Sequence, residues 1–169
     1  MRPALTVTML ALLAGGCLPA LPHVERQLSP AFDPISFFDG RTEGLGTLDI
    51  RGRAPVVVRV ASVGTRTGDS LRLVQTVRLG DDPPYERTFT FRRVGPGRYL
   101  GTLTEAAGPV EATAVGNELT IRYATGRFSS VTQRLTLQPS GRLALNLLTA
   151  RVLGVPVARL TEQIRAVDP

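Results

Sequence analysis

The sequence predicts an all-β protein, an antiparallel up-and-down β-barrel of about 8–10 strands. Apolar and polar residues alternate with a period of two along most of the chain. Glycine and proline, 17 and 13 in number, recur where these alternating stretches end. No segment carries a convincing helical stripe. A chain of 169 residues that is 43% hydrophobic is long enough for one domain with a packed core.

The first half of the barrel is predicted from five alternating stretches. Between Ser70 and Leu79 the apolar side chains fall mainly on odd positions, which gives the strand one apolar face and one polar face. Gly80–Pro84 and Gly95–Gly97 have the composition of turns. The five expected strands are Glu43–Ile50, Pro55–Val63, Ser70–Leu79, Tyr85–Val94 and Arg98–Glu105.

The second half continues the pattern. Leu143–Val152 is the one weak exception, because Leu147, Leu148 and Val152 allow a helical turn. Consecutive hairpins with one dry face each can close as a meander, and closure removes the exposed strand edges that promote aggregation. The remaining expected strands are Pro109–Val115, Glu118–Thr125, Ser130–Gln138, Arg142–Ala150 and Val157–Arg165.

Residues 1–16 are predicted to be a signal peptide. Arg2 precedes an apolar run, Ala4–Ala14, that is too short to span a bilayer as a helix. The run ends in the sequence LAGGC, which resembles a bacterial lipobox with Cys17 as the acylated residue. An ordinary secretory leader cleaved near Ala20 is the alternative. Cys17 is the only cysteine, so it has no disulfide partner within the chain.

Acylation of Cys17 predicts a lipoprotein of the cell envelope. Stable anchoring needs more than one acyl chain, and three palmitate-type chains on one cysteine satisfy that requirement. Leu18 rather than Asp follows the cysteine, which favours the outer membrane, facing the periplasm, in a Gram-negative host. Residues 17–31 then form the lipidated N-terminus and a proline-rich tether that is not packed, and residues 32–167 form the barrel domain.

The net charge of +6 is the balance of 20 arginines against 14 acidic residues, and the chain contains no lysine. A basic balance is compatible with nucleic acid or an anionic membrane, and a GC-rich genome is the simpler explanation. The arginines are scattered and aromatic residues make up only 5% of the chain, so we expect no nucleic-acid partner. We expect a monomer.

The stretch Phe32–Gly46 (FDPISFFDGRTEGLG) resembles the bacterial lipoproteins catalogued as domain of unknown function 3833. The resemblance extends over about Phe32 to Arg165 and implies a lipocalin-like, or calycin-like, β-barrel without an established activity. The chain departs from the family's pattern at Leu45, Phe89 and Ile121, where relatives tend to carry Trp, and at Gln75, where they tend to carry an acidic residue. The other matching residues are Arg87, Phe89, Gly116, Asn117, Tyr123, Asn146 and Gly154.

The inventory of reactive side chains argues against an enzyme. His23 is the only histidine and lies in the tether, so a Ser–His–Asp or Cys–His arrangement is nearly excluded. No cluster has metal-ligand spacing, and we expect neither a metal nor another cofactor. The remaining carboxylates fall at turns or near strand ends, where solvation explains them better than acid–base work: Asp33, Asp39, Asp81, Asp82 and Glu105.

Two functions remain open, and an enzyme that uses carboxylates alone is a third, weaker option. In the first, the barrel interior binds an apolar molecule such as a fatty acyl chain or a lipid. In the second, the same side chains simply fill the barrel, and the protein is a structural or interaction lipoprotein. Its outer arginines (Arg72, Arg78 and Arg92) would then meet anionic lipid headgroups or an acidic protein. Gly101, Ala112 and Ala114 at inward positions favour a cavity. The expected lining is Leu71, Leu73, Phe89, Phe91, Tyr99, Leu103, Leu119, Ile121, Tyr123 and Leu135.

Overall fold

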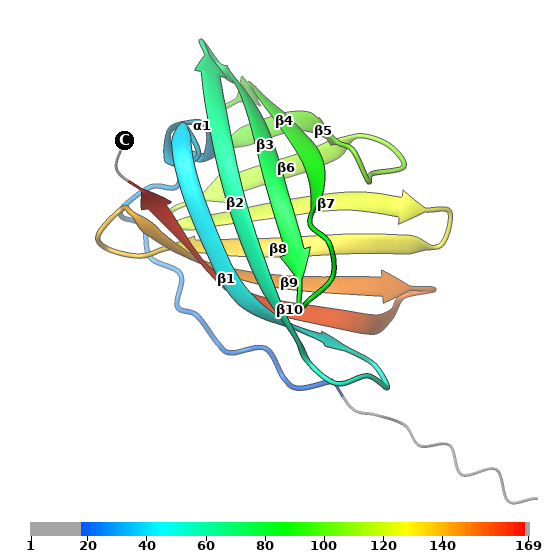
Figure 1. Ribbon diagram of the computed structural model, residues 1–169. Helices are drawn as coiled ribbons and strands as arrows, with labels where there is room; N and C mark the ends of the chain where they lie inside the picture. Colours follow the sequence, from blue (N-terminus) through cyan, green and yellow to red (C-terminus); the bar gives the residue numbers. More distant parts are fainter. Residues whose placement is uncertain (1–17, 168–169) are drawn as a thin grey trace, which may run out of the picture.

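Residues 18–167 of the computed structural model are described here, and they form one closed, antiparallel, ten-stranded β-barrel (Figure 1). The predicted fold class is confirmed. The predicted signal peptide, residues 1–16, and the predicted acylation site, Cys17, lie outside the described residues. Each strand pairs with the next along the chain, and the last pairs with the first, so all ten strands have two neighbours.

The strands follow the ten predicted stretches closely. They are β1 (Gly40–Ile50), β2 (Val56–Thr67), β3 (Ser70–Leu79), β4 (Tyr85–Gly95), β5 (Arg98–Leu103), β6 (Val110–Val115), β7 (Glu118–Gly126), β8 (Ser129–Leu137), β9 (Leu143–Val152) and β10 (Val155–Val167).

Two local expectations are wrong. The helical turn allowed within Leu143–Val152 does not form, because this segment is strand β9 and pairs with both β8 and β10. Gly101 does not make space inside the barrel. A Cβ there would collide with the backbone carbonyl of Thr90, so glycine permits the close approach of β4 and β5 instead.

The inward faces of the strands build two apolar clusters. The larger contains all ten predicted inward residues, each 8% exposed or less, and fills the barrel from β3 round to β9, with Ile164 of β10 added. The smaller contains Val58, Val60, Val77 and Leu160, on β2, β3 and β10. The larger cluster therefore occupies one side of the barrel, and the smaller cluster lies on the side where β10 closes onto β1.

One end of the barrel is closed by a short helical lid, residues 32–38, which includes α1 (Pro34–Phe37). Asp33 caps the helix by accepting a hydrogen bond from the Ile35 N–H, and Pro34 occupies the first turn, where no N–H is required. A Cβ on Gly64 would collide with the carbonyl of Phe38, so this glycine lets the lid approach β2. The lid contributes four buried apolar side chains to the larger cluster: Phe32, Ile35, Phe37 and Phe38.

Asp33 also ties the lid to the barrel wall. Its carboxylate accepts hydrogen bonds from Arg93 of β4 at 3.0 Å and from the Tyr99 hydroxyl of β5 at 3.2 Å. Burial by itself would raise the pKa of Asp33. The hydrogen bond from Ser36, the charge of Arg93 and the remaining hydrogen bonds outweigh burial and lower the pKa below its ordinary value of 3.8.

The opposite end, which we call the mouth end, has no helix in the described chain. It carries the turns β1–β2, β3–β4, β5–β6, β7–β8 and β9–β10, as the up-and-down topology requires. Inward-facing Leu48, Leu79 and Leu148 near this end are only half-buried. Solvent therefore reaches the interior from the mouth end.

The segment before the lid differs from the unpacked tether expected for it. Arg26 forms an ion pair of 2.6 Å with Glu118 of β7. Gln27 and Asn117 exchange two hydrogen bonds, from the Gln27 N–H to Asn117 Oδ1 and from the Asn117 N–H to the Gln27 carbonyl. Asn117 and Glu118, at the turn between β6 and β7, thus hold this segment in place.

The first described residues lie against the outer wall of β10. Arg159 of this strand donates hydrogen bonds to the carbonyls of Leu18 and Pro19. Outward-facing Leu147 of β9 is only 6% exposed and lines the same hollow as Pro22 and Val24. The N-terminal segment is therefore a strap that covers the outer wall from β10 to β7. Within residues 18–167, no helix has the length and apolar character needed to cross a bilayer.

Removing the Asp33 side chain should loosen the lid. We expect Asp33→Ala to lower the free energy of unfolding by about 1 kcal/mol, the usual effect of losing a helix cap. Because the pKa of Asp33 is lowered in the folded state, its contribution is present above the unfolded-state pKa, near 3.8, and is lost as pH falls through the folded-state value. Denaturant unfolding of the variant and the wild type at neutral and acidic pH measures both effects. Asp82→Ala, at an exposed turn, is the control; an equal loss in both variants would contradict the capping role.

Candidate functional site

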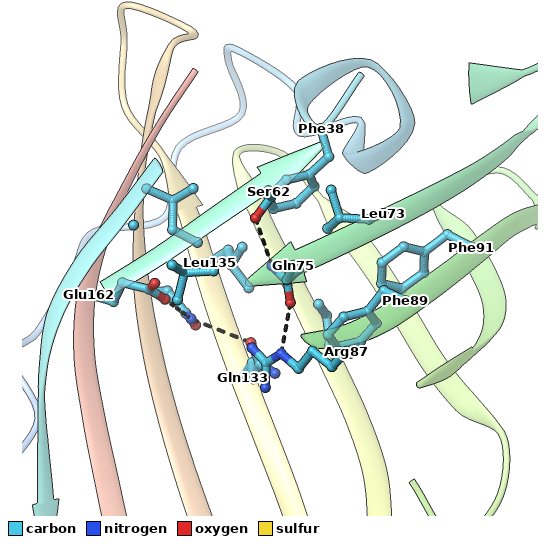
Figure 2. Close-up of a pocket in the computed structure, with 15 residues that line it drawn as sticks. Phe38, Ser62, Leu73, Gln75, Arg87, Phe89, Phe91, Gln133, Leu135 and Glu162 are labelled. Carbon is cyan, nitrogen blue, oxygen red and sulfur yellow. Dashed lines mark hydrogen bonds between the residues drawn. The ribbon is translucent and has the colours of Figure 1, made fainter. Parts of the chain in front are cut away.

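A band of polar side chains crosses the barrel interior between the lid and the mouth (Figure 2). These side chains face inward at positions that the strand alternation would fill with apolar residues. We call them the interior polar cluster: Ser62, Gln75, Arg87, Gln133, Asn146 and Glu162.

Strand register brings the first three together. Ser62 of β2 lies directly opposite Gln75 of β3, and Gln75 lies directly opposite Arg87 of β4. Gln75 donates a hydrogen bond of 3.1 Å to the Ser62 hydroxyl and accepts one of 2.9 Å from Arg87 Nε. The Arg87 guanidinium also pairs with Glu105, beyond the end of β5, at 3.3 Å. Arg87 is therefore held from both sides, with its charge directed across the interior.

The other three form a second chain of hydrogen bonds. Asn146 of β9 lies opposite Glu162 of β10 and donates a hydrogen bond of 2.9 Å to its carboxylate. Asn146 Nδ2 also lies 3.4 Å from Gln133 Oε1 on β8. Gln133 donates to the Tyr123 hydroxyl at 3.2 Å. These contacts fix the orientation of both amides.

Two glycines of β1 make room for Glu162. A Cβ on Gly44 would collide with the Glu162 carboxylate, and a Cβ on Gly46 would lie 2.8 Å from Glu162 Cβ. The GLG stretch of β1 therefore accommodates the buried acid on the neighbouring strand.

Burial dominates the electrostatics of Glu162, which is 5% exposed. Desolvation raises the pKa of Glu162 above its ordinary value of 4.5, and the hydrogen bond from Asn146 and the charge of Arg87 only partly oppose this. The cluster thus combines a guanidinium with a carboxyl group whose ionisation is disfavoured.

Two neighbouring spaces adjoin the cluster. An inner cavity of about 30 Å³ lies toward the lid, between the cluster and the Phe38, Phe91 and Ile164 side chains. An outer cavity of about 130 Å³ lies toward the mouth and is walled by apolar side chains of β1, β2, β3, β9 and β10. Both spaces share five lining residues: Val60, Arg87, Gln133, Asn146 and Glu162.

Asn146 Oδ1 is buried and has no hydrogen-bond partner among the described residues. An unpartnered buried acceptor is costly unless something else pairs with it. Asn146 lines both cavities, and its Oδ1 atom can be paired only by a hydrogen-bond donor.

The predicted lining residues divide into two sets. Five line the inner cavity: Leu73, Phe89, Phe91, Ile121 and Leu135. The other five are packed in the larger apolar cluster and line neither interior cavity: Leu71, Tyr99, Leu103, Leu119 and Tyr123. The apolar side of the barrel is largely filled, and the space lies beside it.

The sequence pattern does not predict the interior polar cluster as a site. In the sequence, Gln75 stands out only as a departure from a family pattern, and Arg87 and Asn146 only as matches to it. A usable signal was present, because each of these residues stands at an inward position between apolar neighbours, as Glu162 does between Leu160 and Ile164. A polar residue at an inward strand position in an otherwise apolar face indicates a functional site or a buried hydrogen-bond network.

The other candidate groups lie apart from this cluster. His23 is exposed on the outer wall, and Asp81 and Asp82 are exposed at the β3–β4 turn. Within residues 18–167 no group of three or more potential metal ligands comes together. A shallow groove of about 630 Å³ runs along the outer wall, with Arg59, Arg78 and Arg165 among its lining residues.

Comparisons with known proteins give a family and a fold. The sequence model of one family, described as "Protein of unknown function (DUF3833)", matches residues 11–139. No curated protein matches the chain in sequence.

Two solved structures have a similar fold. The S-type phycobiliprotein lyase CPES from Guillardia theta superposes with a TM-score of 0.63 over 80% of this chain and 91% of its own, at 8% identity. Rv2717c from M. tuberculosis superposes with a TM-score of 0.57 over 84% of this chain and 100% of its own, at 18% identity. At these identities the likeness concerns the fold alone.

Replacing the buried acid should change how stability depends on pH. Because the native state raises the pKa of Glu162, it retains a proton that the unfolded chain releases near pH 4.5, so the free energy of unfolding falls as pH rises through the interval between the two values. We expect Glu162→Gln to remove this fall and to be relatively more stable than the wild type at neutral pH. Thermal melts across this pH range measure the difference. Glu43→Gln, on the outer face of β1, should retain the wild-type slope; an unchanged slope in Glu162→Gln would contradict the assignment.

Proposed function

The chain belongs to the DUF3833 family of proteins of unknown function, and we propose that it is a membrane-anchored binding protein whose barrel takes in the polar end of a small amphipathic molecule. The observation that carries this proposal is the unpartnered Oδ1 of Asn146 within a buried polar cluster, at the inner end of an apolar cavity. Apolar walls with a few convergent polar groups are the usual composition of a ligand site.

The volume limits what can enter. An engineered cavity of about 150 Å³ binds benzene, so the outer cavity of about 130 Å³ has room for a group of roughly six carbon atoms. A long acyl chain does not fit whole, and most of it would extend through the mouth. The ligand is thus a short amphipathic molecule or one end of a longer one.

The charges favour an acidic polar end. Arg87 places a positive guanidinium at the cavity, and the neighbouring carboxyl group, Glu162, resists ionisation. A ligand carboxylate accepts hydrogen bonds from a guanidinium in a charge-assisted pair. Asn146 Oδ1 is an acceptor, and the amide nitrogen of Asn146 is already directed at Glu162 and Gln133. The ligand therefore pairs with this oxygen only through a donor of its own, such as the O–H of a protonated carboxyl group. A carboxylic acid with an apolar tail, such as a fatty acid, therefore suits the site better than a cation.

Attachment to the membrane is part of the proposal. The lipobox-like sequence LAGGC before Leu18 supports acylation of Cys17, and Leu18 supports sorting to the outer membrane, facing the periplasm, in a Gram-negative host. The acyl chains would hold the protein where amphipathic molecules are concentrated.

We propose binding without catalysis. The lyase activity named for the structural neighbour is a property of that protein. Glu162 is the single carboxyl group among the side chains lining the two interior cavities of the described barrel, and its neighbours there are amides and a guanidinium. The alternative, an interaction lipoprotein that uses its outer wall, is favoured by the basic groove that contains Arg59, Arg78 and Arg165.

Filling the outer cavity should weaken binding. With hexanoate as the probe, we expect the side-chain amide resonances of Asn146 and Gln133 to shift on titration. We expect hexanol to bind more weakly because it lacks the second oxygen that accepts a hydrogen bond from Arg87. Val77→Phe, which fills the outer cavity, should weaken hexanoate binding by about tenfold or more, equivalent to about 1.4 kcal/mol. Thr76→Phe, on the outer face of the same strand, should bind as the wild type does. Equal hexanoate binding by the two variants would refute an interior site.

Membrane attachment is tested at the predicted acylation site. We expect Cys17→Ser to leave the chain unacylated and to move it from the membrane fraction to the soluble fraction or to stall its processing. Mass spectrometry of the purified wild type should show the added acyl mass on an N-terminal Cys17. A wild-type protein cleaved near Ala20 and lacking acyl mass would support the ordinary secretory leader instead.

A further inference from the structure

We propose that three neighbouring turns at the mouth end form a docking surface for an anionic lipid bilayer, so that the barrel opens toward the membrane. The turns are β7–β8, β9–β10 and β1–β2, which are adjacent around the barrel because β10 pairs with β1 and β9 pairs with β8. We call this surface the mouth patch. It consists of Phe128, Val152, Leu153 and Val155 with Arg51, Arg53, Arg127 and Arg151.

The apolar residues form one continuous projection. Phe128 is 60% exposed and Leu153 is 73% exposed. The Leu153 N–H donates a hydrogen bond of 2.8 Å to the Phe128 carbonyl, which joins the two turns. Ser129 pairs with Val152 in the strands just behind them. A contiguous exposed apolar surface on a protein marks an interaction site more often than a scattering of single residues does.

The backbone conformation at Leu153 is unusual for a leucine. Leu153 has a φ of +50°, a conformation that glycine and asparagine adopt more readily than leucine. A glycine does follow, at Gly154, with a φ of +79°. The turn thus carries a large apolar side chain in a left-handed conformation and presents it to solvent, where folding gains little from it.

Arginines surround the apolar projection. The Arg127 guanidinium lies 5.1 Å from the centre of the Phe128 ring. Arg51 and Arg53 are exposed in the β1–β2 turn, and the Arg51 N–H binds the Val157 carbonyl of β10, which holds that turn beside the β9–β10 hairpin. Apolar side chains interspersed with arginine suit the interface of an anionic bilayer. The exposed Asp81 and Asp82 of the β3–β4 turn bound the patch on its far side.

The path of the N-terminal strap gives the second, independent argument. The strap begins beside the β1–β2 hairpin, remote from α1 (Figure 1). Arg159 holds the Leu18 carbonyl four residues from the start of β10, which corresponds to about 13 Å along the strand. The apolar run and Cys17 precede Leu18 in the sequence, so a membrane attachment before Leu18 acts close to the mouth patch.

The docking surface rests on the proposed function for its purpose: the mouth that gives access to the outer cavity would open at the bilayer, where an amphipathic ligand could pass directly between the lipid and Arg87. The docking itself does not need a ligand. If the barrel docks but binds no hexanoate, the proposed ligand is wrong and the docking proposal stands. If the barrel binds hexanoate but does not dock, the docking proposal is wrong and the proposed ligand stands.

Tryptophan fluorescence can map the orientation, because the chain contains no tryptophan. We would place one in the mouth patch, by Leu153→Trp or Phe128→Trp, and one at the lid end, by Val94→Trp, where Val94 is 39% exposed. The full chain is bound to vesicles of phosphatidylcholine and phosphatidylglycerol, with and without bromine on the acyl chains. We expect brominated lipid to remove more than half of the fluorescence of the two mouth variants and to leave that of Val94→Trp unchanged.

Charge variants test the arginines separately. Arg51→Gln combined with Arg53→Gln should weaken partitioning of the full chain into phosphatidylglycerol vesicles by about fivefold per arginine removed, and the difference should shrink at high salt. Arg92→Gln combined with Arg98→Gln, two exposed arginines toward the lid end, removes the same charge and should have a much smaller effect.

Several outcomes would overturn the proposal. Equal quenching at both ends, absence of quenching at the mouth, or failure of the full chain to bind the vesicles each excludes docking by the mouth patch. If both arginine pairs weaken partitioning equally, the attraction depends on the net charge of the protein and not on the mouth patch. If the patch is instead covered by a second copy, the mouth tryptophans will be shielded in lipid-free protein that sediments as a dimer, and Leu153→Asp will convert that dimer to a monomer.

Discussion

The pairing of β1 with β10 is the constraint on which the rest of the structure depends. It runs from Arg41↔Val167 to Ile50↔Ala158 and closes the sheet, so every strand has two neighbours and a fixed inward face. A slip of one residue in any pair would turn an entire strand's side chains to the other face. Closure therefore sets which side chains share the interior, and it is why residues far apart in sequence, such as Gln75 and Glu162, lie in the same band.

That closed interior is not uniformly apolar. The lid end and the β4–β8 side are packed with aromatic and aliphatic side chains, and several of the rings contact one another, as Phe89 contacts both Phe91 and Tyr123. The polar cluster replaces what could have been further apolar packing, and it leaves Asn146 Oδ1 without a partner among the described residues. A well-packed hydrophobic set of similar volume would generally be at least as stable as a buried charged network. This cost in packing is the physical basis for the proposed ligand binding.

The strands and their inward faces could be predicted because period-two alternation is a local signal, as in Leu71, Leu73 and Val77. The interior polar cluster could be predicted only in part. Its members occupy inward positions in their own strands, yet which of them meet depends on registers such as Asn146↔Glu162 that no local pattern specifies. The strap was mispredicted for the same reason: proline-rich composition indicates an extended chain but does not reveal that Arg26 and Gln27 find partners on β7 and the turn before it.

The cavity, the strap and the mouth patch lie in the same sector of the barrel. Val58, Val77 and Leu160, which wall the outer cavity, belong to β2, β3 and β10, where the interior is least filled. The outer wall of β10 receives the start of the strap through Arg159, and the β9–β10 and β1–β2 turns bring apolar side chains and arginines to the mouth of that same sector. A filled scaffold gains nothing from this alignment. In a barrel that exchanges an amphipathic molecule with a membrane, it places the anchor, the lipid contact and the entrance to the polar cluster along one short path.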